Sequence, residues 1–308
     1  MREALVSWIS VWLPQWDHRL RVLRLSAVAN RMRRTYDGFN GRIQTRIHGF
    51  PAVMNGGNPY PFIVSTFPLF NRALVELALQ QGRDAGRKLV VIDIGASLGN
   101  TVLLLQDQAG ASIDSIHCVE GDPEFAELLE INAARFSNVV IHLAMLSREP
   151  GRIAALVRQH PGTATASGAG KVDATTADSL LLPAAPRFDL LKVDIDGSDG
   201  EALTGASRLL RRDQPTVIFE WHPALALKAG NDPRAAFAAL SQAGYRRLLW
   251  FRNTGEFSHF GSVDDREIET WEKYLVAMET HADPHFDVIA LPGRLEHLAF
   301  GIASFGKL

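Results

Sequence analysis

The sequence predicts an α/β fold, in which a mostly parallel sheet is covered by helices on both faces and follows an amino-terminal helical arm. Two observations favour this class. Apolar, strand-like segments alternate with helix-like segments from residue 88 onward, and that alternation is typical of parallel sheets. In addition, residues 90–105 pass from an apolar strand through a glycine-containing turn into a helix, which is how such sheets bind nucleotide-like cofactors.

Local patterns define the individual elements. A tract rich in glycine, proline and asparagine at 36–70 predicts short strands and loops, and Asp122 is the expected N-cap of a following helix. The expected strands cover residues 88–94, 115–119, 139–143, 188–195, 216–220, 246–252 and 288–291. The expected helices cover residues 71–81, 100–108, 123–135, 201–210 and 233–243. Residues 150–180 predict a strand pair and a loop, with a mobile tract at 163–170.

The glycine turn, within VVIDIGASLGNTVLLL, carries the most specific signal. A dinucleotide-binding turn has the pattern G-x-G-x-x-G, but Ser97 and Asn100 occupy its second and third glycine positions here. Asp93 ends the strand, where a carboxylate would repel a pyrophosphate but suits a cationic sulfonium with an amino-acid tail. The turn therefore favours S-adenosylmethionine (SAM) over NAD. The residues expected to bind SAM here are Asp93, Gly95, Ala96, Ser97, Gly99 and Asn100.

A second acidic position supports this interpretation. Glu120, in HCVEGD, follows an apolar strand and lies about twenty residues beyond the turn, where nucleotide-binding folds place the carboxylate that binds the ribose. A carboxylate offers two acceptors to two adjacent hydroxyl donors. Glu120, Gly121 and Asp122 are therefore expected to complete the cofactor site.

Ionisable side chains also gather at the ends of two later strands. In LKVDIDG, strand alternation places Lys192, Asp194 and Asp196 on one side, and in FEWHP it places Glu220 and His222 together. Ligands of open α/β sheets bind beyond the carboxyl ends of the strands, so these five residues are the expected catalytic group. The alternative role for an aspartate in this region is to cap the next helix.

Methyl transfer would give these residues a purpose. A hydroxyl acceptor is too weak an acid to react unaided, and it needs either a general base or a divalent cation that lowers its pKa. Asp194, Asp196 and Glu220 form an oxygen-rich set that suits Mg²⁺ better than Zn²⁺. We therefore expect SAM, with Mg²⁺ as a candidate second cofactor.

Composition limits the class of protein. The 308 residues carry a net charge of −2, which gives no overall reason to expect a nucleic-acid partner. The single cysteine, Cys118, excludes an internal disulfide framework and a cysteine-rich zinc site. With no apolar stretch long enough to span a bilayer and no clean signal peptide, a cytoplasmic location is predicted.

The amino-terminal arm, residues 1–34, is unusual. Trp8, Trp12 and Trp16 recur every four residues and so share one helical face. Basic residues follow them in the chain: Arg19, Arg21, Arg24, Arg31, Arg33 and Arg34. The favoured interpretation is a helix that buries the tryptophans against its own domain or in a homodimer; the alternative is contact with an anionic membrane surface.

Together these motifs resemble the FkbM family of SAM-dependent methyltransferases. The resemblance spans roughly residues 85–292 and rests on VIDIGASLGN, VEGDPEFAELLEIN, TTADSL, LKVDIDGSDGEALTGA, FEWHP and FDVIALP. It implies the class I methyltransferase fold, with a Rossmann-like, mostly parallel seven-stranded sheet, and methylation of a hydroxyl on a sugar, glycolipid or polyketide-type product. The methyltransferase domain is expected at 85–308. The preceding extension, residues 1–84, is largely outside the resemblance and is expected to shape the acceptor pocket or an oligomer contact, with Tyr60, Phe62 and Phe67 as candidate pocket walls.

The resemblance gives the glycine turn and Glu120 the same cofactor-binding roles as above. Lys192, Asp194 and Gly197 match the family's K-x-D-x-E-G motif. Glu220 matches the acid that follows the next strand. The chain departs at Asp196 and Asp199, where glutamate is usual, and the shorter side chains put metal geometry and acceptor position in question. The main hypothesis is an O-methyltransferase. The alternatives are an N- or carboxyl-methyltransferase of a small metabolite, a non-catalytic SAM-binding partner subunit and, least favoured, a nicotinamide oxidoreductase.

Overall fold

An eight-stranded sheet forms the centre of the computed structural model, which describes residues 2–22, 26–160, 163–184, 187–264, 266–278 and 284–306. The strand order is β12-β11-β13-β10-β9-β3-β4-β5. Five neighbours, β10, β9, β3, β4 and β5, run parallel, whereas β13, β11 and β12 add antiparallel pairings at one side. The strands are β3 (Leu89–Ile94), β4 (Ile113–Glu120), β5 (Val139–Leu143), β9 (Leu190–Val193), β10 (Thr216–Trp221), β11 (Arg247–Arg252), β12 (Phe257–Ser262) and β13 (Phe286–Leu291).

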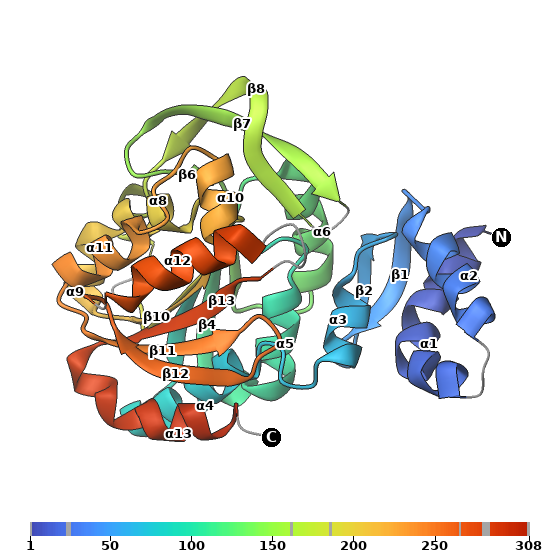
Figure 1. Cartoon of the computed structure of the whole chain (residues 1–308), viewed down its shortest axis with the longest axis horizontal. Helices are drawn as coiled ribbons and strands as arrows, with labels where there is room; N and C mark the ends of the chain where they lie inside the picture. Colours follow the sequence, from blue (N-terminus) through green and yellow to red (C-terminus); the bar gives the residue numbers. More distant parts are fainter. Residues whose placement is uncertain are drawn as a thin grey trace.

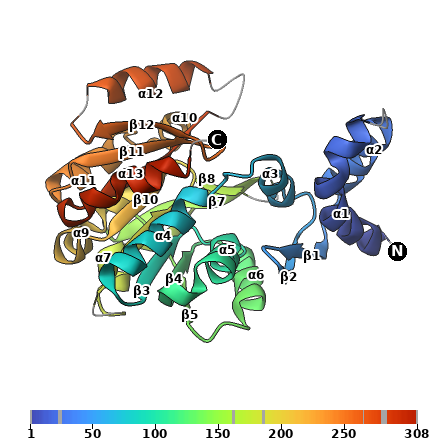
Figure 2. The same ribbon diagram turned by 90° about the horizontal axis from the view of Figure 1, so that it is seen from below.

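Helices cover both faces of this sheet, so the fold has three layers (Figures 1 and 2). On one face, apolar side chains pack from α4 (Arg72–Ala85), α5 (Asn100–Gln108), α6 (Pro123–Ala133) and α13 (Ala299–Ser304). On the other face they come from α7 (Ala177–Leu181), α8 (Asp199–Thr204), α9 (Ser207–Asp213), α11 (Ala235–Gln242) and α12 (Glu267–Met278). The remaining helical segments of this region are η1 (Gly110–Ser112), α10 (Pro223–Lys228) and η2 (Gly293–Leu298).

The predicted fold class is confirmed, with differences in detail. The edge strand β12 was not predicted and brings the described sheet to eight strands rather than seven. Helix α12 was also missed, and the helix expected at 201–210 is two helices, α8 and α9. The tract 163–170, expected to be a mobile loop, belongs to strand β8; its side chains lie outside the described part, and its mobility stays a prediction.

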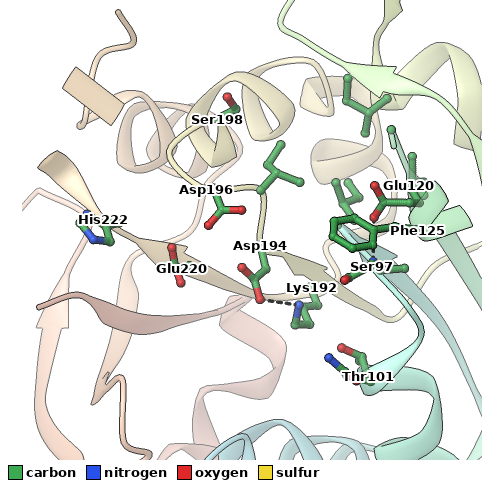
Figure 3. A pocket seen from close by; sticks show the side chains of 18 of the residues that line it. Ser97, Thr101, Glu120, Phe125, Lys192, Asp194, Asp196, Ser198, Glu220 and His222 are labelled. Carbon is green, nitrogen blue, oxygen red and sulfur yellow. Dashed lines mark hydrogen bonds and ion pairs between the residues drawn. The ribbon is translucent and has the colours of Figure 1, made fainter. Parts of the chain in front are cut away.

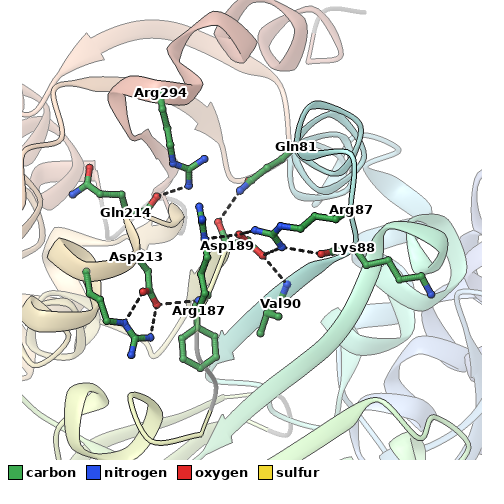
Figure 4. Close-up of polar contacts among 11 residues, drawn as sticks. Gln81, Arg87, Lys88, Val90, Arg187, Asp189, Asp213, Gln214 and Arg294 are labelled. Atoms are coloured by element: carbon green, nitrogen blue, oxygen red, sulfur yellow. Dashed lines mark hydrogen bonds and ion pairs between the residues drawn. The ribbon is translucent and has the colours of Figure 1, made fainter.

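A polar network fixes the sheet at the end opposite the carboxyl ends of the parallel strands (Figure 4). Asp189, just before β9, accepts two hydrogen bonds from the Arg87 guanidinium, at 2.6 and 2.8 Å, and one from the Val90 amide at 3.0 Å. Burial alone would raise the pKa of Asp189, but these donors outweigh it and lower the pKa. Gln81 of α4 donates to the Asp189 carbonyl at 2.9 Å, so the network holds α4, β3 and β9 together.

A hairpin extends over the carboxyl ends of the parallel strands. It consists of β7 (Gly151–His160) and β8 (Thr163–Thr175), and the short β6 (Met145–Leu146) pairs with β8 to complete a three-stranded sheet. Figure 1 shows this hairpin rising above the central sheet. The predicted strand pair within 150–180 is thus confirmed.

The amino-terminal elements lie beyond α5 and α6, on the side of these helices that faces away from the central sheet (Figures 1 and 2). They are α1 (Arg2–Val22), α2 (Ser26–Asp37), the antiparallel pair β1 (Arg42–Ile47) and β2 (Phe50–Asn55), and α3 (Tyr60–Thr66). Their apolar core includes side chains from α5 and α6, such as Leu103 and Leu128, and is therefore attached to the sheet domain. The domain boundary at 84/85 stays a prediction; it falls in the last turn of α4, which packs on the sheet.

The favoured interpretation expected the tryptophans to be buried against their own domain or in a homodimer. They are not buried against their own chain. Val6, Ile9 and Leu13 form the inner face of α1 and are buried, whereas Trp8, Trp12 and Trp16 retain 51%, 45% and 43% of their exposure. The side chains of Arg19 and Arg21, and all of Arg24, lie outside the described part of the chain. Within the described residues, no helix has both the length and the apolar character required to cross a bilayer.

Candidate active site

A cavity of about 390 Å³ lies at the carboxyl ends of β3, β4, β9 and β10. This size is within the range of small-molecule sites. Figure 3 shows side chains from the glycine turn and from the ends of these strands pointing into it. Of the predicted residues, those lining the cavity are Gly95, Ala96, Ser97, Asn100, Glu120, Gly121, Lys192, Asp194, Asp196, Glu220 and His222. The structure therefore brings together two groups that are distant in the sequence.

The glycine turn begins the cavity wall. Gly95 has a φ of +80°, and a Cβ there would lie 1.8 Å from the Asp194 carbonyl oxygen, so only glycine fits between β3 and the end of β9. Gly99, also with positive φ, is the N-cap of α5. Its role is to turn the chain into the helix, and it is not among the residues that line the cavity. The turn is thus shaped by close packing as well as by local conformation.

Glu120 anchors the turn from β4. Its Oε2 accepts the Ser97 amide at 2.7 Å and its Oε1 accepts the Asp122 amide at 2.8 Å. Burial raises the pKa of Glu120 to about 7. Asp122 does not line the cavity; its side chain caps α6 by accepting the Glu124 amide at 2.8 Å, which confirms the predicted N-cap.

These residues fit SAM. Each Glu120 oxygen uses one lone pair on a backbone amide and keeps another for a ribose hydroxyl, since a carboxylate oxygen accepts two hydrogen bonds. Asn100 lines the cavity, and its side-chain oxygen is buried without a hydrogen-bond partner among the described residues, as expected of an acceptor that a polar ligand would satisfy. A cofactor with a diol and a polar amino-acid tail satisfies both features.

Lys192 is the cation at the centre of the site. Its Nζ donates to Asp194 Oδ2 at 3.0 Å and lies 3.4 Å from Asp93 Oδ1. Burial alone would lower the pKa of Lys192, but Asp194 and Asp93 outweigh it and raise the pKa. Asp93 is fully buried behind Lys192 and does not line the cavity; it holds Lys192, and its predicted contact with the cofactor stays a prediction. This pairing follows from the register, in which Asp93 and Lys192 are parallel cross-strand partners.

A second acidic group lies beyond Lys192. Glu220 on β10 is directly opposite Asp287 on β13, and both line the cavity. Burial, together with the charges of Asp194, Asp196, Asp199 and Asp287, holds the pKa of Glu220 well above its usual range. Burial and Asp194 raise the pKa of Asp287 to about 7.

Asp196 reaches this group by an unexpected backbone path. Strand β9 ends at Val193, so strand alternation does not extend to Asp196 as predicted. Instead, Asp196 has a φ of +50°, a left-handed conformation that aspartate tolerates better than most residues. Asp199 is the first residue of α8 and not its cap, because the cap position belongs to Ser198.

His222 is placed differently from the predicted general base. It is the N-cap of α10, and its Nδ1 accepts the Leu225 amide at 3.3 Å. In the neutral ring the hydrogen is then on Nε2, which is a donor and not an acceptor. His285 stacks on His222, with ring centroids 5.4 Å apart, and its Nε2 lies 3.4 Å from Glu220 Oε2.

The predicted Mg²⁺ site has no support in this geometry. Among the described residues, no three histidine, cysteine or acidic side chains are arranged to hold a metal ion. Asp194, Asp196 and Glu220 line one cavity, but the nearest cation to Asp194 is the Lys192 ammonium.

Two segments that are distant in the sequence from the strand ends also line the cavity. The amino-terminal extension contributes Tyr60, Ile63 and Phe70, and the hairpin contributes Ile153 and Leu156. Tyr60 is therefore a wall as predicted. Its hydroxyl lies 2.6 Å from His48 Nε2, which ties the wall to the β1–β2 turn.

The other two candidate walls, Phe62 and Phe67, are not among the residues that line this cavity. Phe62 packs in the core of the extension, with the Arg33 guanidinium 3.9 Å from its ring centroid, and Phe67 does not reach the cavity either.

Asp287 and His285 line the cavity but were not predicted from the sequence. Both belong to the segment that enters the closing strand, HFDVIALP. An acid at the start of an otherwise apolar strand is a weak signal. Its meaning depends on β13 lying beside β10, which the sequence did not indicate.

Comparison with known proteins identifies the family. The methyltransferase FkbM domain family matches residues 93–247, just over half of the chain, whereas no curated protein matches the sequence. Among solved structures, methyltransferase FkbM from Methylobacillus flagellatus KT is 18% identical with a TM-score of 0.41, over 53% of this chain and 40% of that one.

Two further similar structures carry methyltransferase names. Precorrin-6y C5,15-methyltransferase from Geobacter metallireducens GS-15 is 15% identical with a TM-score of 0.39, over 72% and 87% of the two chains. An O-methyltransferase from Bacillus cereus in complex with SAH is 14% identical with a TM-score of 0.38, over 71% and 79%. The family match shows that the chain belongs to the FkbM methyltransferase domain family.

Proposed function

We propose that this protein is a SAM-dependent O-methyltransferase that acts on a hydroxyl of a sugar, glycolipid or polyketide-type metabolite. One observation carries the proposal. Four carboxyl groups, those of Asp194, Asp196, Glu220 and Asp287, line the same cavity as the glycine turn and Glu120. A hydroxyl acceptor needs a base in this position, whereas an amine acceptor does not.

SAM, when bound by the glycine turn and Glu120, supplies a methyl group on a positively charged sulfonium. The acceptor oxygen would bond to this methyl carbon, and the electron pair of the broken carbon–sulfur bond would remain on sulfur. The proton of the acceptor hydroxyl must leave at the same time. The protein's task is to align the hydroxyl and to take this proton.

The Glu220–Asp287 pair suits the role of base. General bases work best when their pKa is near the working pH, and the pKa of Asp287 is about 7. The pKa of Glu220 is held well above its usual range and that of Asp287 is about 7, so near neutral pH the pair holds one proton and the Asp287 carboxylate is the acceptor. Asp194, oriented by Lys192 at 3.0 Å, is placed to fix the acceptor hydroxyl by a hydrogen bond.

The test separates cofactor binding from chemistry. Calorimetry should detect SAM and S-adenosylhomocysteine binding to the wild type, with and without Mg²⁺, and Glu120→Ala should abolish it. The double variant Glu220→Gln/Asp287→Asn, which removes both carboxyl groups of the pair, should bind SAM normally but lose transfer of labelled methyl groups to hydroxyl acceptors. Folded wild type that binds neither compound would overturn the assignment as a SAM enzyme. Transfer to amines that the double variant leaves unchanged would favour the N-methyltransferase alternative.

A further inference from the structure

The outer face of the amino-terminal arm is apolar and exposed. We define the arm face as the exposed apolar side chains of α1 and α2, which are Leu5, Trp8, Trp12, Trp16 and Val28. A shallow groove between the two helices adjoins them and is lined by Ile9, Met32 and Arg31. Single exposed apolar residues are ordinary, but a contiguous group with three tryptophans marks an interaction site.

Contacts on the inner face of α1 fix the orientation of this helix and so keep its tryptophans exposed. Val6, Ile9 and Leu13 are buried in the core of the extension. The Ser10 hydroxyl donates to Thr45 Oγ1 of β1 at 2.9 Å, and the Ser65 hydroxyl of α3 donates to the Pro14 carbonyl. With its inner face held in this way, α1 cannot turn to bury the tryptophans in its own chain.

Charge separates the arm from the rest of the molecule. Residues 2–37 contain seven arginines and three acidic residues, so they carry a net charge of +4, and the remainder of the chain therefore carries −6. Arg31 and Arg34 are exposed on α2. The arm is thus a cationic, aromatic surface on an otherwise acidic protein.

We propose that the arm face docks on an anionic membrane surface. Tryptophan is favoured at the membrane–water interface because its ring is apolar and its N–H is polar. Arginines near the surface add attraction to anionic headgroups. A helix with one face fixed on protein and the other apolar lies in the plane of the interface.

A second copy of the chain fits this surface less well. A two-fold symmetric contact places the same patch of both subunits together, and here it would bring two arms of charge +4 against each other. Anionic lipids neutralise that charge, whereas a second arm doubles it.

The experiment uses the full-length protein and two kinds of vesicle, pure phosphatidylcholine and an equimolar mixture of phosphatidylcholine with phosphatidylglycerol. We expect cosedimentation with the mixed vesicles only, weakened by salt, with quenching of tryptophan fluorescence by brominated lipids. The triple variant Trp8→Ser/Trp12→Ser/Trp16→Ser should bind at least tenfold more weakly. Arg31→Gln and Arg34→Gln should each weaken binding by about fivefold.

Tyr274→Ser is the matched control, because Tyr274 lies on α12, outside the arm, and is 52% exposed. It should bind vesicles as the wild type does. Equal binding by the wild type and the triple variant, or none by the folded wild type, would overturn the proposal. So would a dimer in solution that fails to bind vesicles and dissociates in the triple variant, which would assign the arm face to a second copy. If the triple variant misfolds, fluorescence of the wild type still tests the proposal: quenching by brominated lipids supports membrane docking, and no quenching overturns it.

Discussion

Glu220 and Asp287 are cross-strand partners on β10 and β13, and both carboxyl groups line the same cavity. Like charges directly opposite each other in an antiparallel pair destabilise the sheet, and both groups have a raised pKa. The fold therefore tolerates a cost at this position, and buried acids that are held partly protonated are typical of sites of proton transfer.

The buried acids predict how stability depends on pH. Burial raises the pKa of Asp199 from 3.8 to about 7, so the folded protein holds this proton more tightly than the unfolded chain does. Stability from this source is complete below about pH 4 and is lost as the pH rises to about 7. Asp199→Asn should therefore raise the free energy of unfolding at pH 8, on the order of 1–3 kcal/mol. Urea titrations from pH 4 to 8 measure it.

The control for Asp199→Asn is Asp173→Asn, because the Asp173 side chain is 96% exposed. This change should leave the pH dependence of unfolding as it is in the wild type. An equal effect of both substitutions would show that burial of Asp199 is not the cause.

Binding of SAM should depend on the ionisation of Glu120. Its pKa is raised to about 7 by burial, and only the ionised carboxylate accepts from two hydroxyls while it also accepts from two amides. Affinity should rise with pH below 7, by up to about tenfold per pH unit, and level off above it. Glu120→Gln should bind weakly at every pH and abolish this dependence, as measured by calorimetry between pH 6 and 8. A wild-type affinity that is flat over this range would contradict the assignment.

Removal of the Lys192 charge should destabilise the core. Lys192→Met leaves Asp93, which is fully buried, without its ion pair at 3.4 Å. Loss of one partner of a buried pair costs about 3–5 kcal/mol. The double variant Lys192→Met/Asp93→Asn should recover much of this, because it removes the isolated charge. Denaturant unfolding of the two single variants and the double variant forms a complete cycle, and additive effects would mean that the pair is not coupled.

Gly95 should be intolerant of any side chain. A Cβ there meets the Asp194 carbonyl oxygen at 1.8 Å, so Gly95→Ala must displace β3 or the end of β9. It should abolish SAM binding and lower the melting temperature sharply. Gly86→Ala provides the comparison, because Gly86 also has a positive φ, of +61°, but has no atoms within 4 Å of the new Cβ. That change should cost only about 1 kcal/mol and leave SAM affinity intact.

His222 should contribute to structure more than to proton transfer. Its Nδ1 caps α10, so His222→Ala should cost about 1 kcal/mol of stability, and His222→Asn should retain most of it, because asparagine is a good N-cap. If Nε2 only donates a hydrogen bond, neither substitution should remove the ionisation that governs the pH–rate profile. Disappearance of that ionisation in His222→Asn would instead identify the imidazole as the base.

The local sequence was sufficient to predict the bounds of an element where residues at both of its ends signal them. Helix α5 and strand β5 have the predicted bounds, Asn100–Gln108 and Val139–Leu143. The glycine turn and Glu120 were also found, because a strand, a tight turn and an acid at fixed spacing form a single βαβ unit. These features depend on contacts between residues close in the sequence.

Tertiary contacts decided the rest. The helix expected at 201–210 is divided because Asp178 of α7 accepts the Arg208 and Leu209 amides, both at 2.8 Å, and so caps α9 from elsewhere in the chain. Asp287 joined the site because β13 lies beside β10, and Asp93 turned away from the cavity because β9 places Lys192 next to it. The sequence alone determined the sheet class and the cofactor turn, since strand periodicity and turn chemistry are local. Strand order and helix packing determined which charges meet and that the tryptophans remain exposed, because those outcomes depend on neighbours that are distant in the chain.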